Sequence, residues 1–178
     1  GDILKEHADL IDAYEPDEAE VGVFFSPQAY YLHWNQEGHC GMPQNGVLGY
    51  LRALLRRHIP YRVVEEEHLE ALEGLRVLFM PRAIVVDPDK AEALSEWVKA
   101  GGTLVCESEC GAFASNGLYR YPEDRFLADL AGISEIGRRK LEANTVPIRY
   151  RGETLTLPAR QWLTPLDDEG DEVLGWHG

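Results

Sequence analysis

Short apolar runs alternate with helical patterns over the first two thirds of the chain. The apolar runs are rich in β-branched and aromatic residues and have the length of ordinary buried strands. They cover residues 21–25, 61–64, 76–80 and 103–106. An apolar run without polar alternation is typical of a strand that is covered on both faces. The pattern therefore predicts four parallel strands, connected through helical segments.

Two of the connecting segments have the spacing of crossover helices. The first carries apolar residues at helical intervals with arginines on the other face: Val47, Leu48, Leu51, Leu54 and Leu55 against Arg52, Arg56 and Arg57. The second begins with Asp87 as N-cap and Pro88 at the first helical position, and it ends at Gly101-Gly102. We expect shorter helices over 65–72, where acidic residues favour a helix start, and over 123–131.

The two ends of the chain have a different character. Residues 4–14 predict a short amphipathic helix, followed by an acidic linker over 15–18. After Gly132, residues 145–150, 153–157 and 172–176 predict short strands separated by turns. The predicted fold class is α/β: a three-layer, flavodoxin-like parallel sheet with a small β-rich C-terminal appendage.

The charge balance restricts the possible partners. The 178 residues include 31 acidic and 17 basic ones, so the formal net charge is -14. Such a chain repels phosphate backbones and anionic lipid head groups, so we expect neither a nucleic acid nor a membrane partner. No apolar run approaches the ~20 residues that cross a bilayer. Three cysteines do not form an even disulfide framework, so we expect reduced thiols in a cytoplasmic protein.

The segments that follow the predicted strands meet at one edge of the sheet, where α/β proteins bind their ligands. Residues 26–41, predicted to be a surface loop, contain an unusual density of aromatic rings. Tyr and Trp are enriched in protein interfaces, and sugar rings also stack on them, although such rings can equally cover a sheet. Our candidates for interface or substrate-lining residues are Tyr30, Tyr31, His33, Trp34, Arg82, Glu107 and Glu109.

Cys106 is the candidate nucleophile, because it ends the fourth predicted strand. Class I glutamine amidotransferases carry their nucleophile at this position of a similar sheet. A strand-to-helix elbow needs small residues two positions on either side, whereas Leu104 and Ser108 flank Cys106. The one histidine downstream is His177, so we expect an inert thiol here, and likewise at Cys110.

A metal site is the second hypothesis, with His33, His39 and Cys40 as ligands. Imidazole and thiolate suit zinc, but this spacing matches no established zinc motif. We therefore expect no metal and no cofactor. The acidic run 65–67 is not expected to form a catalytic carboxylate pair, because its three consecutive side chains point in different directions.

Several phrases between Ala19 and Glu135 resemble one known domain. They are the strand over 20–25, the strand and turn over 75–83, the helix, double glycine and strand over 94–105, and the helix over 126–133. Together they resemble the middle, trimerisation domain of glycoside hydrolase family 42 β-galactosidases, which has a class I glutamine amidotransferase-like fold. The helix-Gly-Gly-strand phrase also occurs in other amidotransferase-like families, and residues 106–111 depart from the pattern.

The resemblance implies a non-catalytic oligomerisation domain. Residues 1–18 would be the linker helix from an N-terminal TIM barrel, 19–135 the trimerisation domain, and 136–178 an appendage that continues beyond this chain. The partners would be that barrel and two further copies in a homotrimer, with strand-end loops lining a neighbour's active site. The barrel itself, of roughly 250 residues, does not fit in this chain. The alternatives are a stand-alone hydrolase that uses Cys106 and a carbohydrate-binding module that uses the aromatic segment.

Overall fold

The computed structural model describes residues 2–15, 18–135, 137, 139–142, 144–159, 162–168 and 175–176. Its centre is a sheet of four parallel strands, β1 (Val21–Phe25), β2 (Tyr61–Glu65), β3 (Val77–Met80) and β4 (Thr103–Cys106). Their spatial order is β2-β1-β3-β4. The four predicted strands are confirmed, with boundaries that shift by at most one residue.

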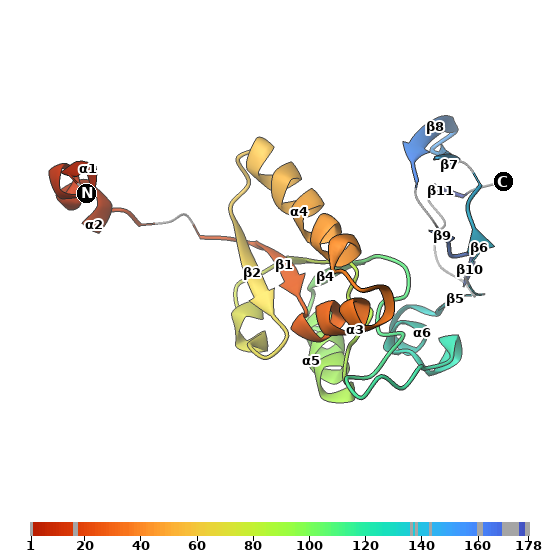
Figure 1. Ribbon diagram of the computed structural model, residues 1–178. Coiled ribbons are helices and arrows are strands. Elements are labelled where there is room, and N and C mark those ends of the chain that lie inside the picture. The colour runs from red at the N-terminus through yellow and green to blue at the C-terminus, as the bar shows by residue number, and fades with distance from the viewer. Residues whose placement is uncertain are drawn as a thin grey trace.

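Helices cover both faces of this sheet (Figure 1). On one face lies α4 (Gly41–Arg56), whose Tyr50 ring packs against Phe79 with 4.9 Å between the ring centroids. On the other lies α5 (Pro88–Lys99), whose fully buried Leu94 belongs to the same cluster as Leu78. Because Leu78 and Phe79 are consecutive strand residues, they point to opposite faces. The α/β prediction with helices on both faces is therefore confirmed.

Two glycines allow close packing in this core. A Cβ on Gly22 of β1 would lie 2.7 Å from a methyl carbon of Leu75, and one on Gly102 would lie 2.5 Å from the Trp97 ring. Both distances are too short for a real contact. Gly102 thus lets the strand that leaves α5 pass directly beneath the indole of the same helix.

Three local predictions differ from the structure. The segment after β1, predicted to be a loop, contains the helix α3 (Pro27–Glu37). The acidic run 65–67 does not begin a helix: Glu65 ends β2, and a 3₁₀-helix η1 begins only at Leu69 (Leu69–Leu72). The predicted helix over 123–131 is also shorter, with a 3₁₀-turn η2 (Pro122–Asp124) before α6 (Phe126–Ala131).

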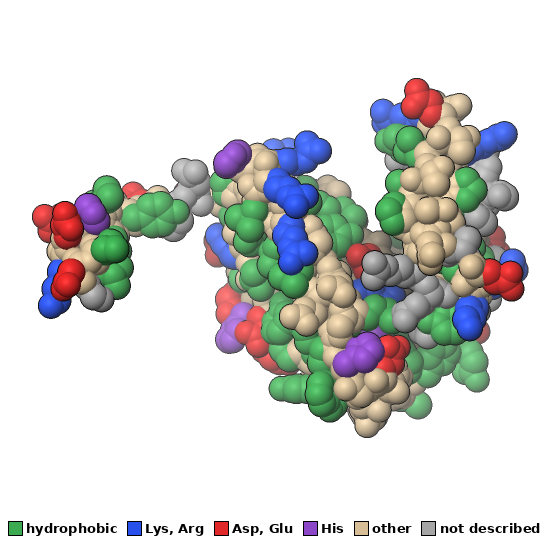
Figure 2. All heavy atoms as spheres, turned by 45° about the horizontal axis from the view of Figure 1, so that its top comes forward, with side chains coloured by type: hydrophobic (Ala, Val, Ile, Leu, Met, Phe, Trp, Pro, Cys, Tyr) green, Lys and Arg blue, Asp and Glu red, His purple; other side chains and the backbone are tan. Residues whose placement is uncertain are grey.

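Helix α4 begins at Gly41, earlier than the apolar pattern predicted. Its arginine face is exposed as predicted, and Figure 2 shows these side chains along the outside of the helix. Leu55, predicted to belong to the buried stripe, is 58% exposed, whereas Leu54 is buried. The buried stripe of α4 is therefore narrower than its sequence indicates.

The C-terminal part consists of short antiparallel strands, which lie to one side of the α/β body (Figure 1). β5 (Ile133–Glu135) pairs with β10 (Leu166–Asp168), and β6 (Arg139–Lys140) pairs with β9 (Trp162–Leu163). β7 (Thr145–Tyr150) lies between β8 (Glu153–Pro158) and β11 (Gly175–Trp176). The predicted β-rich appendage is confirmed; the part of its last strand over 172–174 lies outside the described residues.

The N-terminal residues form two short helices, α1 (Asp2–Glu6) and α2 (Ala8–Asp12), where one helix over 4–14 was predicted. They project away from the body, and neither contains a buried residue (Figure 1). Among the described residues, no helix has the length and apolar character needed to span a membrane.

Candidate functional site at the strand ends

Helix α3 begins directly at the end of β1, and a buried carboxylate anchors its start. The Ser26 hydroxyl accepts a hydrogen bond from Ala29 N (3.1 Å) and donates one to Glu66 Oε2 (2.6 Å). Glu66 Oε1 also accepts from Gln28 N (3.0 Å). Burial raises the pKa of Glu66, although the hydrogen bonds from Ser26 and Gln28 act in the opposite direction. The Glu66 side chain therefore supports the N-terminus of α3 across the sheet edge, where negative charge is favourable.

The outer face of α3 presents the predicted aromatic residues. Tyr31 and Trp34 are 68% and 61% exposed. Tyr30 is half-buried and packs edge-on against Phe25, with 5.1 Å between ring centroids. A shallow hollow of about 470 Å³ is lined by Phe25, Pro27, Tyr30, Tyr31, Trp34 and Cys40. Among the residues that the structure describes, no charged side chain lines this hollow, so its surface suits an apolar partner better than a charged ligand.

His33 lies on the inner side of the same helix. Its side chain is 3% exposed, so it is not on the surface that Tyr31 and Trp34 form. The other two proposed metal ligands are engaged locally: His39 Nδ1 accepts from Gly41 N (3.2 Å), and Cys40 Sγ donates to Tyr30 O (3.5 Å). Among the described residues, no group of three His, Cys, Asp or Glu side chains could hold a metal ion.

Arg82, Glu107 and Glu109 do come together, at the ends of β3 and β4. Arg82 Nη2 lies 3.5 Å from Glu109 Oε2, and both side chains are largely buried, at 15% and 10% exposed. Arg82 N donates to Glu107 Oε2 (3.2 Å). Arg82 and Glu109 both have positive φ angles, 48° and 65°. Non-glycine residues in this conformation cost about 1–3 kcal/mol each and cluster at functional sites.

Tyr50 of α4 is a further member of this group. Burial, followed by the charge and hydrogen bond of Glu107, raises the pKa of Tyr50 to about 12. The phenol therefore stays protonated at neutral pH and keeps its hydrogen bond to the carboxylate. This contact ties α4 to the end of β4.

A second ion pair lies behind Glu109. Glu135 of β5 accepts a hydrogen bond from Glu109 N and pairs with Arg125, whose side chain is 5% exposed. Arg125 Nη2 also donates to the Tyr119 hydroxyl (3.0 Å). The strand-end edge thus consists of two arginines and three carboxylates in one connected hydrogen-bonded network, which fixes the turn after β4.

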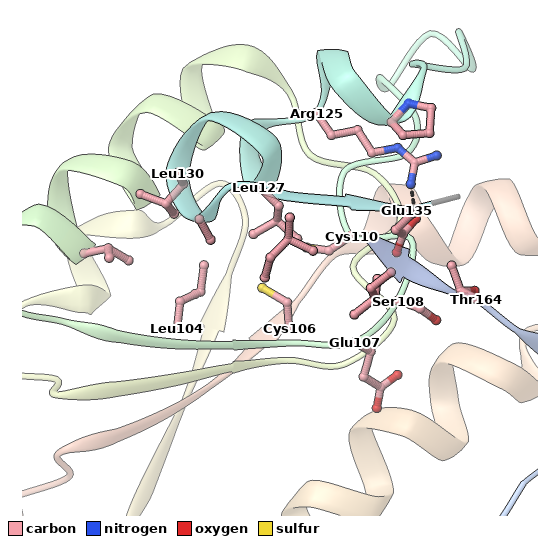
Figure 3. A pocket seen from close by; sticks show the side chains of 15 residues that line it. Leu104, Cys106, Glu107, Ser108, Cys110, Arg125, Leu127, Leu130, Glu135 and Thr164 are labelled. Carbon is pink, nitrogen blue, oxygen red and sulfur yellow. Dashed lines mark hydrogen bonds and ion pairs between the residues drawn. The ribbon is translucent and has the colours of Figure 1, made fainter. Parts of the chain in front are cut away.

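Cys106 faces a cavity of about 310 Å³ between β4, α6 and β5 (Figure 3). Apolar residues such as Leu104, Leu127 and Leu130 form most of its wall, and the Arg125–Glu135 pair lies at one end. The described residues that line the cavity include no histidine. His177, the base that the sequence offered, lies outside the described residues.

The sequence did not predict the roles of Tyr50, Arg125 and Glu135. Tyr50 is 57 positions from its partner Glu107, Arg125 is 10 from Glu135, and Glu135 is 26 from Glu109. No local spacing in the sequence therefore marks these residues. Local residues do mark helix α3: Ser26-Pro27 has the N-cap and first-position residues of a helix, and Gly38 closes it in a left-handed conformation.

A family model described as the β-galactosidase trimerisation domain matches residues 19–177. No curated protein matches the chain. The solved structures similar to this chain include three β-galactosidases. The enzyme of Bacillus circulans sp. alkalophilus has 23% identity and a TM-score of 0.83, and the match covers 98% of this chain and 27% of that one. Gan42B of G. stearothermophilus has 22% identity and a TM-score of 0.82, with 99% and 26% covered, and the enzyme of Rahnella sp. R3 has 22% identity and a TM-score of 0.79, with 99% and 27% covered. At these identities the likeness shows the fold, and the chain spans about a quarter of each relative's length.

Proposed function

Because the chain belongs to the β-galactosidase trimerisation domain family, we propose that it is a non-catalytic oligomerisation domain of a glycoside hydrolase, and that copies of it associate as a homotrimer. The observation that carries this proposal is the exposed aromatic face of α3, with Tyr31 and Trp34 beside a hollow whose described lining contains no charged side chain. Large aromatic residues that are exposed in one copy are the ones that contribute most to binding when an interface buries them.

Charge supports the same surface. Copies with a formal net charge of -14 repel one another. Contact therefore costs least where the surface carries no charge, and the α3 hollow is such a surface. The chain's acidity, which excludes nucleic acid as a partner, thus also favours an apolar face for self-association.

We propose a divided role for the residues at the strand ends. Tyr30, Tyr31 and Trp34 contact a neighbouring copy and line the entrance to its active site. Arg82, Glu107 and Glu109, whose side chains are half-buried or buried, fix the edge from which that entrance is formed. The parent protein is then a β-galactosidase-like hydrolase, with its catalytic residues in an N-terminal TIM barrel.

The finer assignments belong to the same proposal. The strand order β2-β1-β3-β4 agrees with the first four strands of a flavodoxin-like sheet, the class to which amidotransferase-like domains belong. Residues 1–18 are proposed as the linker from the barrel, 19–135 as the trimerisation domain and 136–178 as its appendage. Three free cysteines support a reducing, cytoplasmic environment.

The two rival functions have less support. A hydrolase using Cys106 needs a base beside the thiol, and none of the described residues around its cavity is a histidine. A carbohydrate-binding module needs polar side chains that bond sugar hydroxyls next to the aromatic rings. Among the described residues, the lining of the α3 hollow offers the tyrosine hydroxyls and the Cys40 thiol, and no carboxylate, amide or guanidinium.

Light scattering of the 20.0 kDa chain tests the proposal. We expect the wild type to have about three times the mass of one chain, and Tyr31→Ser/Trp34→Ser to have the mass of one. Tyr121→Ser is the matched control, because Tyr121 is 66% exposed and lies outside the α3 hollow, so its trimer should persist. A double variant that keeps the wild-type mass would exclude α3 as the interface.

A further inference from the structure

Two of the three cysteines lie at the same place in the fold. Cys106 is the last residue of β4, and Cys110 follows after the turn that contains Glu109. Both line the 310 Å³ cavity (Figure 3). Cys110 is 1% exposed within the main hydrophobic core, and Cys106 is partly buried and packs against the same core.

The two thiols are also in contact. The hydrogen bond with Cys106 is the largest cause that raises the pKa of Cys110, and burial is the next. Cys110 is therefore a protonated, buried thiol with a second thiol as its neighbour. Cys40 differs, because its Sγ donates to the Tyr30 carbonyl at the junction of α3 and α4, away from this cavity.

We propose that Cys106 and Cys110 form an oxidative modification site, a dithiol that a hydroperoxide converts to a reversible intramolecular disulfide. In the first step the Cys106 thiolate attacks a peroxide oxygen; an S–O bond forms, the O–O bond breaks, and an alcohol or water leaves. In the second step the Cys110 thiolate attacks the Cys106 sulfur; the S–S bond forms, the S–O bond of the sulfenic acid breaks, and the leaving hydroxide takes up a proton and departs as water. Two thiols are oxidised, and one peroxide is reduced by two electrons.

The order of the two steps follows from burial. The oxidant reaches Cys106 first, because Cys106 is the more exposed of the two and opens onto the cavity. Cys110 is then the resolving thiol, which protects the sulfenic acid at Cys106 from further oxidation. Because Cys110 must lose a proton before it attacks, disulfide formation should be faster at pH 9 than at pH 7.

The disulfide would act on the turn between the cysteines. This turn carries Glu107, which accepts from Arg82 N, and Glu109, which pairs with Arg82 and donates through its N–H to Glu135. Closing the ring over 106–110 fixes both carboxylates in place. Oxidation thus stiffens the strand-end edge without changing its charge. This inference does not depend on self-association.

The experiment treats the reduced wild type with one equivalent of hydrogen peroxide, then alkylates it in denaturant and measures the intact mass. We expect loss of two of the three alkylation sites, a peptide in which Cys106 is linked to Cys110, and full recovery of the sites with dithiothreitol. Cys40→Ser is the matched control and should form the same linked peptide. Cys106→Ser should retain both of its remaining alkylation sites, whereas Cys110→Ser should lose the Cys106 site to sulfenic or higher oxidation and form no linked peptide.

Three results would overturn the proposal. They are sulfinic or sulfonic acid at Cys106 with no linked peptide, a linked peptide that contains Cys40, and a disulfide only between two chains. The wild type and Cys40→Ser suffice for this decision, so it does not depend on the folding of the core variants.

Discussion

The buried ion pair between Arg125 and Glu135 gives the sharpest test of how the strand-end edge is held. The two side chains are 5% and 11% exposed, so neither charge is solvated when its partner is removed. Removing one partner of a buried pair costs about 3–5 kcal/mol, because the remaining charge stays buried. Arg125→Leu also removes the hydrogen bond to the Tyr119 hydroxyl. We therefore expect Arg125→Leu and Glu135→Leu each to destabilise the protein by about 3–5 kcal/mol.

The double variant distinguishes a buried pair from an exposed one. Replacing both partners with apolar residues leaves neither charge of this pair buried without its partner, and such replacements are often neutral or even stabilising. We expect Arg125→Leu/Glu135→Leu to cost well below the sum of the single changes, with a coupling energy of about 2 kcal/mol or more.

The assay is urea unfolding, followed by far-ultraviolet circular dichroism and by tryptophan fluorescence in parallel. In parallel thermal melts of a chain of this size, each single variant should lower the melting temperature by roughly 6–20 °C. Glu20→Leu is the matched control, because its ion pair with Arg76 is exposed, and it should change stability by about 0–1 kcal/mol. The buried ion pair would be refuted if Arg125→Leu and Glu135→Leu each lowered the free energy of unfolding by less than about 1 kcal/mol and their effects added up in the double variant.

Two further variants test α4 and α5. Tyr50→Phe should lose about 1.5–3 kcal/mol at neutral pH through its missing bond to Glu107. Because the pKa of Tyr50 is raised in the folded protein, the wild type should lose stability as pH rises from about 10 to 12. Tyr50→Phe should lose less stability over this range. Equal losses in thermal melts would contradict the contact between Tyr50 and Glu107. Gly102→Ala places a methyl group against the Trp97 ring and should lower the free energy of unfolding by about 1–3 kcal/mol in urea. Gly49→Ala is the control, because a methyl group there meets nothing within 4 Å, and it should be neutral or stabilising. Equal effects of the two changes would contradict the close packing of Gly102 against Trp97.

The sheet could be predicted from the sequence because β1, β3 and β4 are short runs without a charged residue, and β2, which contains Arg62, follows Pro60 at the end of a helical pattern. Asp87-Pro88 and Gly101-Gly102 mark the ends of α5 directly. The apolar pattern does not predict helix α3, because its buried residues are Ala29 and His33, while the rings of Tyr31 and Trp34 are exposed. A helix whose aromatic residues are exposed has no apolar stripe for periodicity to detect.

The candidate site could be predicted only as a location. The ends of β3 and β4 lie at one edge of the parallel sheet, and Arg82, Glu107 and Glu109 are in contact there; their role as interface or substrate-lining residues stays a prediction. The sequence predicts Glu66 as part of a helix start and not as the anchor of α3, because its partners, Ser26 and Gln28, are 40 and 38 residues away. In the turn after β4, the non-glycine residue with a positive φ angle is Glu109, which pairs with Arg82, and neither Cys106 nor Cys110 has this conformation. The strained residue of this turn is therefore a carboxylate with a structural role and not a cysteine nucleophile.

The molar mass of the full-length protein that contains this chain tests the central claim most directly. Light scattering at micromolar concentration and physiological salt would measure it. A mass three times that of its polypeptide, reduced to a single polypeptide by Tyr31→Ser/Trp34→Ser, is the predicted result. A wild-type product with the mass of one polypeptide would contradict the claim that this domain holds copies together.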